Sequence, residues 1–257
     1  MSSLVGGYAV VYGDGFLVDM CGRYASARNR HDLLEEFEIE LDSEEEIEPD
    51  YNVAPTKDVY AVMSRVPKVE GATQPVRQLR VIRWGLVPSW AKDPSIGSRL
   101  INARMETLAD KPAFRKAFAS RRCLLPADGY FEWMPTPDKK KQPYFIHPAD
   151  GGVLAMAGLY EFWKDPEGEW LCTCTVITTA AADHLGEIHD RTPMCIEKDH
   201  WTDWLDPRIT DASELLVPAS AAGLVAEPVS MAVNNVRNNG PELIHPLQDT
   251  GDPSPLF

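Results

Sequence analysis

Cys21 follows Met20 in the run Met-Cys-Gly-Arg-Tyr, which looks like a second translation start. If the mature chain begins at Cys21, an α-amine and a thiol lie on the same residue. Such a 1,2-aminothiol condenses with an aldehyde to give an imine, and the thiol then adds to the imine carbon and closes a five-membered thiazolidine. No internal cysteine has this chemistry. In the sequence as written, however, nineteen residues and Met20 precede Cys21, so its nitrogen is an amide.

Other groups of reactive side chains predict less chemistry. Cys172 and Cys174 are two residues apart, so on a strand they share one face with Val176, and we interpret them as core residues. His184 and His189 are five residues apart, which is not the spacing of helical zinc ligands. The sequence has no Walker loop, no dinucleotide-binding glycine fingerprint and no serine nucleophile elbow. We therefore expect no metal and no cofactor.

Eight short motifs occur in an order that makes a family resemblance specific. They are Cys21-Gly22-Arg23-Tyr24, Tyr51-Asn52-Val53-Ala54-Pro55-Thr56, Trp84-Gly85-Leu86-Val87-Pro88-Ser89-Trp90, Asn102-Ala103-Arg104-Met105-Glu106-Thr107, Gly129-Tyr130-Phe131-Glu132-Trp133, Ile188-His189-Asp190-Arg191-Thr192-Pro193, Val233-Asn234-Asn235-Val236-Arg237 and Gly240-Pro241-Glu242-Leu243-Ile244. In this order they closely resemble the SRAP (SOS response-associated peptidase) family. Members of that family form a covalent crosslink with single-stranded DNA at abasic sites. The resemblance covers roughly Cys21 to Leu247.

The resemblance implies which residues carry the reaction. The processed N-terminal cysteine of the family maps to Cys21, and the catalytic asparagine, glutamate and histidine map to Asn102, Glu132 and His189. One departure is Thr192, which stands where the family usually has methionine. The residues that we expect to bind DNA are Arg23, Asn52, Trp84, Trp90, Arg104 and Arg191.

Abasic-site chemistry predicts similar parts. An abasic sugar is mostly a closed hemiacetal, so a group such as His189 must protonate the ring oxygen to release the aldehyde. Glu132 could accept a proton from the α-amine and orient it, and Asn102 could hydrogen-bond the sugar. Arg23 and Arg104 could hold the flanking phosphates. Trp84 and Trp90 each have two interpretations: packing in the core, or stacking on bases of an opened strand.

Composition restricts the class of protein. The chain has 257 residues, of which 44% are apolar, so it holds one large domain or two small ones. No apolar run reaches the ~20 residues of a membrane span. Five cysteines do not suggest a disulfide scaffold, and their odd number fits a reduced cytosol. We therefore expect a cytoplasmic protein, associated with the nucleoid when it is bound to damaged DNA, with no membrane partner and in monomeric form.

The chain has a net charge of −14, but this charge is unevenly distributed along the sequence. Residues 71–125 contain eleven basic and three acidic residues, so this segment carries +8 and the remainder −22. Such asymmetry is expected of a site for a polyanion, although the same arginines could be scattered salt-bridge partners. The acidity elsewhere, with only ten lysines, suggests adaptation to high salt. Because salt weakens counterion-release binding, a covalent bond to nucleic acid would suit such a cytoplasm.

The elements that position these residues are mostly strands. The pattern predicts helices over 29–39, with Asn29 as N-cap, and over 112–119, 180–185 and 199–205. It predicts strands over 59–66, 77–84, 123–125, 130–133, 144–147, 153–160 and 171–178. We expect a single antiparallel-β-rich α+β domain, barrel-like, with peripheral helices.

The sequence predicts three segments and leaves three alternative functions open. We assign residues 1–20 to a leader or a misassigned start, 21–250 to the SRAP-like domain and 251–257 to a tail. The leader lacks the basic residues of a secretory signal, and a strand from Tyr8 to Tyr12 is the alternative for it. The alternative functions are a thiol autopeptidase that removes residues 1–20, a class II glutamine amidotransferase with an N-terminal cysteine, and a non-catalytic nucleic-acid-binding module. The enzyme class is therefore a crosslinking thiol protein with autopeptidase (hydrolase) and lyase-type activity.

Overall fold

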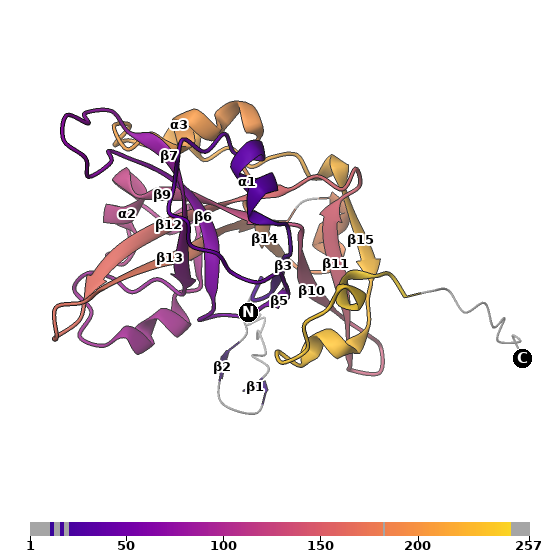
Figure 1. The fold of residues 1–257 in the computed structure, drawn as a ribbon. Coiled ribbons are helices and arrows are strands. Elements are labelled where there is room, and N and C mark those ends of the chain that lie inside the picture. The colour runs from indigo at the N-terminus through magenta and orange to yellow at the C-terminus, as the bar shows by residue number, and fades with distance from the viewer. Residues whose placement is uncertain (1–10, 13–15, 18–20, 182, 248–257) are drawn as a thin grey trace, which may run out of the picture.

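Five strands close into a barrel in the computed structural model of the chain, which describes residues 11–12, 16–17, 21–181 and 183–247 (Figure 1). The strands are β6 (Asp58–Arg65), β7 (Val76–Trp84), β9 (Arg122–Ala127), β12 (Leu154–Lys164) and β13 (Trp170–Ala180). Their order is β13-β12-β9-β6-β7, with antiparallel neighbours. A parallel pairing between β7 and β13 then closes the ring.

A second, antiparallel sheet of five strands lies beside the barrel in the order β15-β11-β10-β3-β5. Its strands are β3 (Tyr24–Ser26), β5 (Asp50–Val53), β10 (Gly129–Pro135), β11 (Lys141–Pro148) and β15 (Leu224–Pro228). Only Asp128 separates β9 from β10, so the chain passes from barrel to sheet at a sharp corner. The Asp128 carboxylate accepts the backbone N–H of Ala27 at 2.6 Å, which ties this corner to the end of β3.

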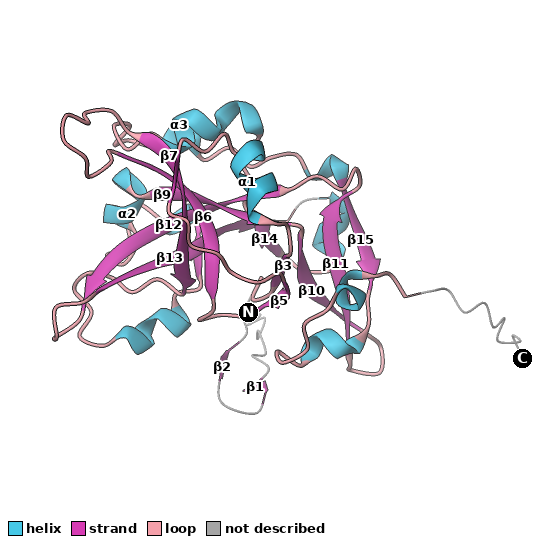
Figure 2. Ribbon diagram, viewed as in Figure 1, coloured by secondary structure: helices cyan, strands magenta, loops and turns pink. Residues whose placement is uncertain are grey.

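Helices lie at the periphery of the strands (Figure 2). They are α1 (Arg30–Glu36), α2 (Arg115–Ser120) and α3 (Trp201–Leu205), with 3₁₀ turns at Pro94–Arg99, Met105–Thr107, Asp183–Glu187, Lys198–His200, Ser213–Leu215, Ala221–Gly223, Met231–Asn234 and Pro241–Ile244. The remaining strands are short: β1 (Val11–Tyr12), β2 (Phe16–Leu17), β4 (Leu41–Asp42), β8 (Asn102–Arg104) and β14 (Arg191–Pro193). In the described part of the chain, no helix has the length and apolar character needed to cross a membrane.

Strand β6 shows why the barrel strands are apolar on both faces. Val59, Ala61 and Met63 face one core cluster, which also contains Trp84 and the interior residues of the other barrel strands. Tyr60 and Val62 face the cluster that the three helices cover. Because both faces are buried, the strand has a continuous hydrophobic run rather than an alternating pattern.

The predicted fold class is confirmed: the domain is antiparallel-β-rich, contains a barrel and carries its helices outside. The first helix is shorter than predicted, but the Asn29 side chain caps it by accepting the N–H of Asp32 at 3.0 Å. The helix predicted over 180–185 begins too early, because Ala180 ends β13 by pairing with Arg191 of β14, and the structure instead has a 3₁₀ helix over Asp183–Glu187. Of the alternative strand from Tyr8 to Tyr12, only Val11–Tyr12 lies within the described residues, and it pairs with β2.

Candidate active site

The four residues predicted to carry the reaction come together from four separate segments. Cys21 lies at the start of the chain segment that becomes β3, and Glu132 lies on β10, which pairs with β3 at Tyr24. Asn102 begins β8, and His189 precedes β14. Strands β8 and β14 flank the last residues of β13 on its two sides, so the end of this barrel strand positions the segments of both Asn102 and His189.

One carboxylate oxygen of Glu132 contacts both reactive atoms of Cys21. The Cys21 backbone nitrogen donates to Oε1 at 2.8 Å, and the Cys21 thiol donates to the same Oε1 at 2.7 Å. Both residues are buried, with 5% of Cys21 and 4% of Glu132 exposed. One buried carboxylate oxygen is therefore within reach of the protons on both the nitrogen and the sulfur of Cys21.

Burial shifts the protonation of this pair in one direction. Desolvation raises the pKa of Glu132, while the charge of His189 and the hydrogen bonds from Cys21 oppose that shift. Desolvation also raises the pKa of the Cys21 thiol well above its ordinary value, and the Glu132 charge adds to the rise. The thiol is therefore protonated at neutral pH, and Glu132 is a better proton acceptor than an exposed carboxylate.

His189 and Asn102 approach this pair from the barrel side. The backbone N–H of Arg191 donates to Nδ1 of His189 at 3.1 Å, so in the neutral ring the proton lies on Nε2. Asp190 Oδ1 lies 3.2 Å from the same Nδ1, and the protonated ring could donate to it. The amide of Asn102 donates to the backbone carbonyl of Cys21 at 3.5 Å. The Asn102 contact places a side-chain amide next to Cys21, and the charge of His189 acts on the Glu132 carboxylate.

Tyr130 and Thr192 form a hydroxyl pair that the sequence analysis did not assign to the site. The Tyr130 hydroxyl and Thr192 Oγ1 are 2.7 Å apart, which links β10 to β14. Burial raises the pKa of Tyr130, and the hydrogen bond with Thr192 opposes the rise. A signal was present, because Tyr130 is two residues before Glu132 and therefore lies on the same face of a strand.

Two of the six residues expected to bind DNA are buried. Trp84 is 0% exposed, and its Nε1 donates to the Ile101 carbonyl at 2.9 Å. Its edge contact with Tyr24, at 5.2 Å between ring centroids, completes a core environment. In this arrangement the indole cannot stack on a base, so packing is the interpretation that the structure favours. Asn52 is likewise 0% exposed.

The other four lie nearer the surface. Trp90 is 57% exposed on the loop that follows β7, and Arg104 is exposed at the end of β8. Arg23 is half-buried. Arg191 makes a bidentate ion pair with Glu106, at 2.6 and 3.0 Å, and also donates to the carbonyl of Thr178. Its guanidinium is thus already engaged by protein groups.

The basic segment 71–125 is not a single free surface. Arg77 pairs with Glu38 at 2.8 Å, and Arg121 pairs with Glu161 at 2.7 Å. Arg122 is 2% exposed and donates to three backbone carbonyls at the end of α2 and around α3. These three arginines are engaged by protein groups and support the fold.

Metal chemistry has no evident ligand set in the described ranges. Within them, no three His, Cys, Asp or Glu side chains are grouped so that they could hold a metal ion.

Comparison with known proteins gives consistent matches over the same region. Residues 20–236 match the family described as SOS response associated peptidase (SRAP). The chain is 42% identical over 229 residues to the abasic site processing protein YoqW of Bacillus subtilis (strain 168). This match covers 88% of this chain and 99% of YoqW. It is 37% identical over 241 residues to the abasic site processing protein YedK of Escherichia coli (strain K12), covering 89% of this chain and 100% of YedK.

More distant relatives and solved structures agree. The abasic site processing protein HMCES of Gallus gallus is 34% identical over 227 residues, or 78% of this chain and 67% of HMCES. A crystal structure of a protein from Bacteroides thetaiotaomicron shares the fold, with a TM-score of 0.74 at 23% identity over 88% of this chain and 100% of that one. A second, from Bordetella bronchiseptica, gives a TM-score of 0.67 at 26% identity over 82% of this chain and 100% of that one. With the ordered motifs and the site geometry, these matches show that the chain belongs to the SOS response associated peptidase family.

Proposed function

We propose that this protein binds abasic sites in single-stranded DNA and traps them as a thiazolidine through the amine and thiol of a processed Cys21. The observation that carries the proposal is the single Glu132 oxygen at 2.8 Å from the Cys21 nitrogen and 2.7 Å from its sulfur. Relatives of the chain are named abasic site processing proteins, which supports the same substrate. The mature domain begins at Cys21, after removal of residues 1–20.

The first stage opens the sugar and forms the imine. The protonated ring of His189 donates its Nε2 proton to the ring oxygen of the hemiacetal and keeps its Nδ1 proton, next to Asp190. A water molecule takes the proton of the anomeric hydroxyl as the aldehyde forms. Glu132 takes a proton from the Cys21 ammonium, whose pKa in model peptides is about 7.7–8.0. The amine adds to the aldehyde carbon, and the resulting carbinolamine loses one water. Asn102 hydrogen-bonds the sugar oxygen while these steps occur.

The second stage closes the ring. The Cys21 sulfur adds to the imine carbon, and its proton passes through Glu132 Oε1 to the ring nitrogen. Aminothiol and aldehyde thus become thiazolidine and one water. An imine to this sugar invites β-elimination and strand cleavage, so its removal by the thiol protects the strand. Reversal uses the same groups in the opposite order, with His189 again supplying the proton.

The flanking strand is held by residues around the aminothiol. Arg23 and Arg104 contact phosphates, and the exposed Trp90 stacks on a base. Arg191 contributes to this surface if its pair with Glu106 opens. Trp84 and Asn52 are buried, so they support this surface without contacting the strand. The protein acts as a monomer in the cytoplasm, at damaged DNA.

The decisive experiment mixes protein that begins at Cys21 with a single-stranded oligonucleotide containing one abasic site, followed by denaturing electrophoresis. We expect a shifted band that Cys21→Ala abolishes and that duplex or intact DNA does not give. Absence of the band, or its survival in Cys21→Ala, would defeat the proposal. Non-covalent binding of intact and abasic strands alike would favour a plain binding module, and ammonia release from glutamine an amidotransferase.

Autopeptidase activity is a second candidate, favoured by the same oxygen. In an N-to-S acyl shift, the Cys21 sulfur attacks the Met20 carbonyl carbon, the C–N bond breaks and a thioester forms. The thiol proton must move to the departing Cys21 nitrogen, and Glu132 Oε1 lies within hydrogen-bond distance of both atoms. Water then hydrolyses the thioester, which releases residues 1–20 as a carboxylate and leaves Cys21 with a free amine and thiol.

A tag placed ahead of Met1 tests this candidate in purified protein. Loss of the tag with time, at the mass expected for cleavage before Cys21, supports self-cleavage if Cys21→Ala and Glu132→Gln both prevent it. Stable full-length mass in the unmodified chain would show that the amine is generated in some other way.

A further inference from the structure

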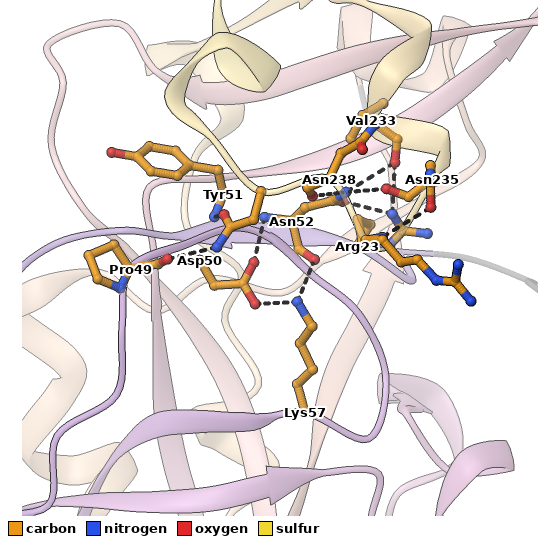
Figure 3. Close-up of polar contacts among 11 residues, drawn as sticks. Arg23, Pro49, Asp50, Tyr51, Asn52, Lys57, Val233, Asn235 and Asn238 are labelled. Carbon is orange, nitrogen blue, oxygen red and sulfur yellow. Dashed lines mark hydrogen bonds and ion pairs between the residues drawn. The ribbon is translucent and has the colours of Figure 1, made fainter.

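The side-chain amide of Asn52 is the centre of a buried hydrogen-bond cluster (Figure 3). Its Oδ1 accepts a hydrogen bond from Arg23 Nη1 at 2.7 Å. Its Nδ2 donates to the backbone carbonyls of Val233, Asn235 and Asn238 at 3.2, 3.1 and 3.0 Å. One amide therefore joins Arg23, two residues after Cys21, to a loop near the C-terminal end of the domain.

Neighbouring groups hold Asn52 itself in place. Its backbone N–H donates to Asp50 Oδ1 at 2.8 Å, and Asp50 Oδ2 pairs with Lys57 at 2.5 Å. Lys57 also donates to the Asn52 carbonyl at 3.3 Å. The amide is thus presented to Arg23 from a backbone that is anchored on both of its polar groups.

Arg23 is held at its backbone and at one end of its guanidinium. Its carbonyl accepts the N–H of Phe131 at 2.9 Å, next to Glu132 on β10. Its Nη1 donates both to Asn52 and, at 2.9 Å, to the carbonyl of Val233. Among the described residues, neither Nε nor Nη2 of Arg23 donates a hydrogen bond, and Nε is buried. Two donors of a planar fork, separated from Cys21 by one residue, are thereby left for a ligand.

We propose that Asn52 is a positioning residue that orients the Arg23 guanidinium toward a DNA phosphate beside the trapped sugar. A guanidinium recognises a phosphate best when two of its N–H groups are presented in a defined direction. Asn52 and Val233 engage Nη1 and thereby fix the direction of the guanidinium, which leaves Nη2 and the buried Nε as its donors without a partner among the described residues. The inference rests on the proposed function, because it needs DNA at Cys21, but it gives Asn52 no contact with DNA.

The test measures non-covalent affinity for a single-stranded oligonucleotide that carries tetrahydrofuran in place of the abasic sugar, so that no aldehyde is present. Asn52→Ala is expected to weaken binding about tenfold, the loss expected for a charge-assisted contact. The slope of log affinity against log salt should also fall by about 0.7, the value of one phosphate contact on a single strand. An uncharged residue changes this slope only if it acts through a charged one.

A double-mutant cycle separates positioning from independent effects. Arg23→Ala should also weaken binding about tenfold, and the double variant should be no weaker, whereas independent contacts would give about a hundredfold. With a true abasic strand, the half-saturating DNA concentration of Asn52→Ala should rise about tenfold while the maximal crosslinking rate stays within about twofold.

Asn239→Ala is the matched control for loosening of the same loop. Asn239 accepts from the backbone N–H of Tyr51 at 2.8 Å and donates to the Pro49 carbonyl at 3.0 Å, without contacting Arg23. Its removal should leave both affinity and salt slope unchanged. If Asn52→Ala and Asn239→Ala weaken binding equally, the loop and not Arg23 is responsible, and the inference is wrong.

Two further results keep the inference separate from folding and from the proposed function. If thermal unfolding shows that Asn52→Ala is not folded at the assay temperature, Arg23→Lys replaces it, because lysine keeps the charge but lacks the oriented fork. We expect that variant to bind about tenfold more weakly, and wild-type affinity in it would overturn the inference. If the unmodified protein forms no crosslink, the proposed function fails, whereas crosslinking with an unchanged Asn52→Ala affinity refutes only the positioning role.

Discussion

Glu132 is the residue at which reactivity and stability conflict. Its carboxylate is 4% exposed, and desolvation raises its pKa. A folded-state pKa above the unfolded value means that the folded chain binds more protons just above pH 4.5, the ordinary pKa of a glutamate. The associated stability is therefore fully present below that pH and is lost as the pH rises through the folded-state pKa.

Replacing Glu132 by glutamine should stabilise the fold and slow the reaction. Glutamine keeps an oxygen for the two Cys21 donors but carries no charge to desolvate. We expect the free energy of unfolding at pH 7 to rise by about 1 kcal/mol, and the crosslinking rate to fall by about 10²-fold or more. Urea unfolding from pH 4 to pH 8 and single-turnover crosslinking measure the two effects.

Glu161→Gln is the control, because Glu161 is also buried but pairs with Arg121 at 2.7 Å. Breaking that pair should lower stability and leave crosslinking intact. A Glu132→Gln protein that is less stable than wild type at pH 7 would contradict the argument.

The hydroxyl pair of Tyr130 and Thr192 is a second prediction at this scale. Tyr130→Phe removes one hydroxyl from a 2.7 Å contact and keeps the ring that packs in the core. We expect a loss of about 1 kcal/mol in unfolding free energy, because the Thr192 hydroxyl loses its partner. The double variant with Thr192→Val should lose less than the sum of the single variants in urea unfolding. Strict additivity would show that the two hydroxyls do not depend on each other.

Among the elements, the loop between β7 and β8 controls where Asn102 lies. Gly85 has φ +123°, and its N–H donates to the Cys174 carbonyl at 2.8 Å. Leu86 then donates to the Leu100 carbonyl at 3.1 Å, which returns the chain to the barrel two residues before Asn102. A Cβ on Gly85 would lie 2.8 Å from the Gly97 carbonyl oxygen, so the loop closes only over a glycine.

Gly85→Ala should destabilise the domain by about 3 kcal/mol, from the left-handed backbone and from this backbone clash. Gly71→Ala is the matched control, since Gly71 also has a positive φ, +81°, but an added Cβ would meet nothing within 4 Å. It should cost only about 1 kcal/mol. Equal losses in urea unfolding would mean that the contact with Gly97 is not constrained.

Elements were predictable from sequence where local chemistry decides them. Asn29 predicts the start of the first helix because its side chain caps that helix. The apolar runs of the barrel strands are long enough to predict strands. The start of the helix predicted over 180–185 is misplaced because Ala180 pairs with β14, a long-range contact, and the helical turn covers Asp183–Glu187 instead. Trp84 illustrates the same limit within the site, because a motif tryptophan gives no sign of whether its ring faces the core or the surface.

For the molecule as a whole, charge and covalent chemistry act together. The chain has a net charge of −14, and three arginines of its basic segment support the fold, so its reversible attraction to DNA is limited. Closure of the barrel by a parallel β7–β13 pairing was not visible in the sequence either, since no local pattern specifies which strands meet. Two of the three segments that join Cys21 at the site depend on the barrel, because β8 and β14 lie on either side of β13, and the third depends on the pairing of β10 with β3.

Salt should therefore weaken the reversible complex with DNA and leave the covalent product intact. We expect the complex with a tetrahydrofuran-containing strand to dissociate in 1 M KCl, with affinity falling linearly on a log–log plot. The product formed with a true abasic strand should persist in the same salt and in denaturant. Electrophoretic mobility shift and denaturing gels measure the two species. A product that disappears in molar salt would show that no covalent bond had formed.

The thiol of Cys21, held as S–H beneath a carboxylate and 5% exposed, also has a consequence for its survival. Peroxide and alkylating agents attack thiolates, and a thiol kept protonated by burial offers them little. Oxidative stress strips bases from DNA at the same time as it inactivates exposed low-pKa cysteines. Because the Cys21 thiol stays reduced and protonated until a sugar carbonyl enters the site, the protein would remain active during the oxidative stress that produces abasic sites.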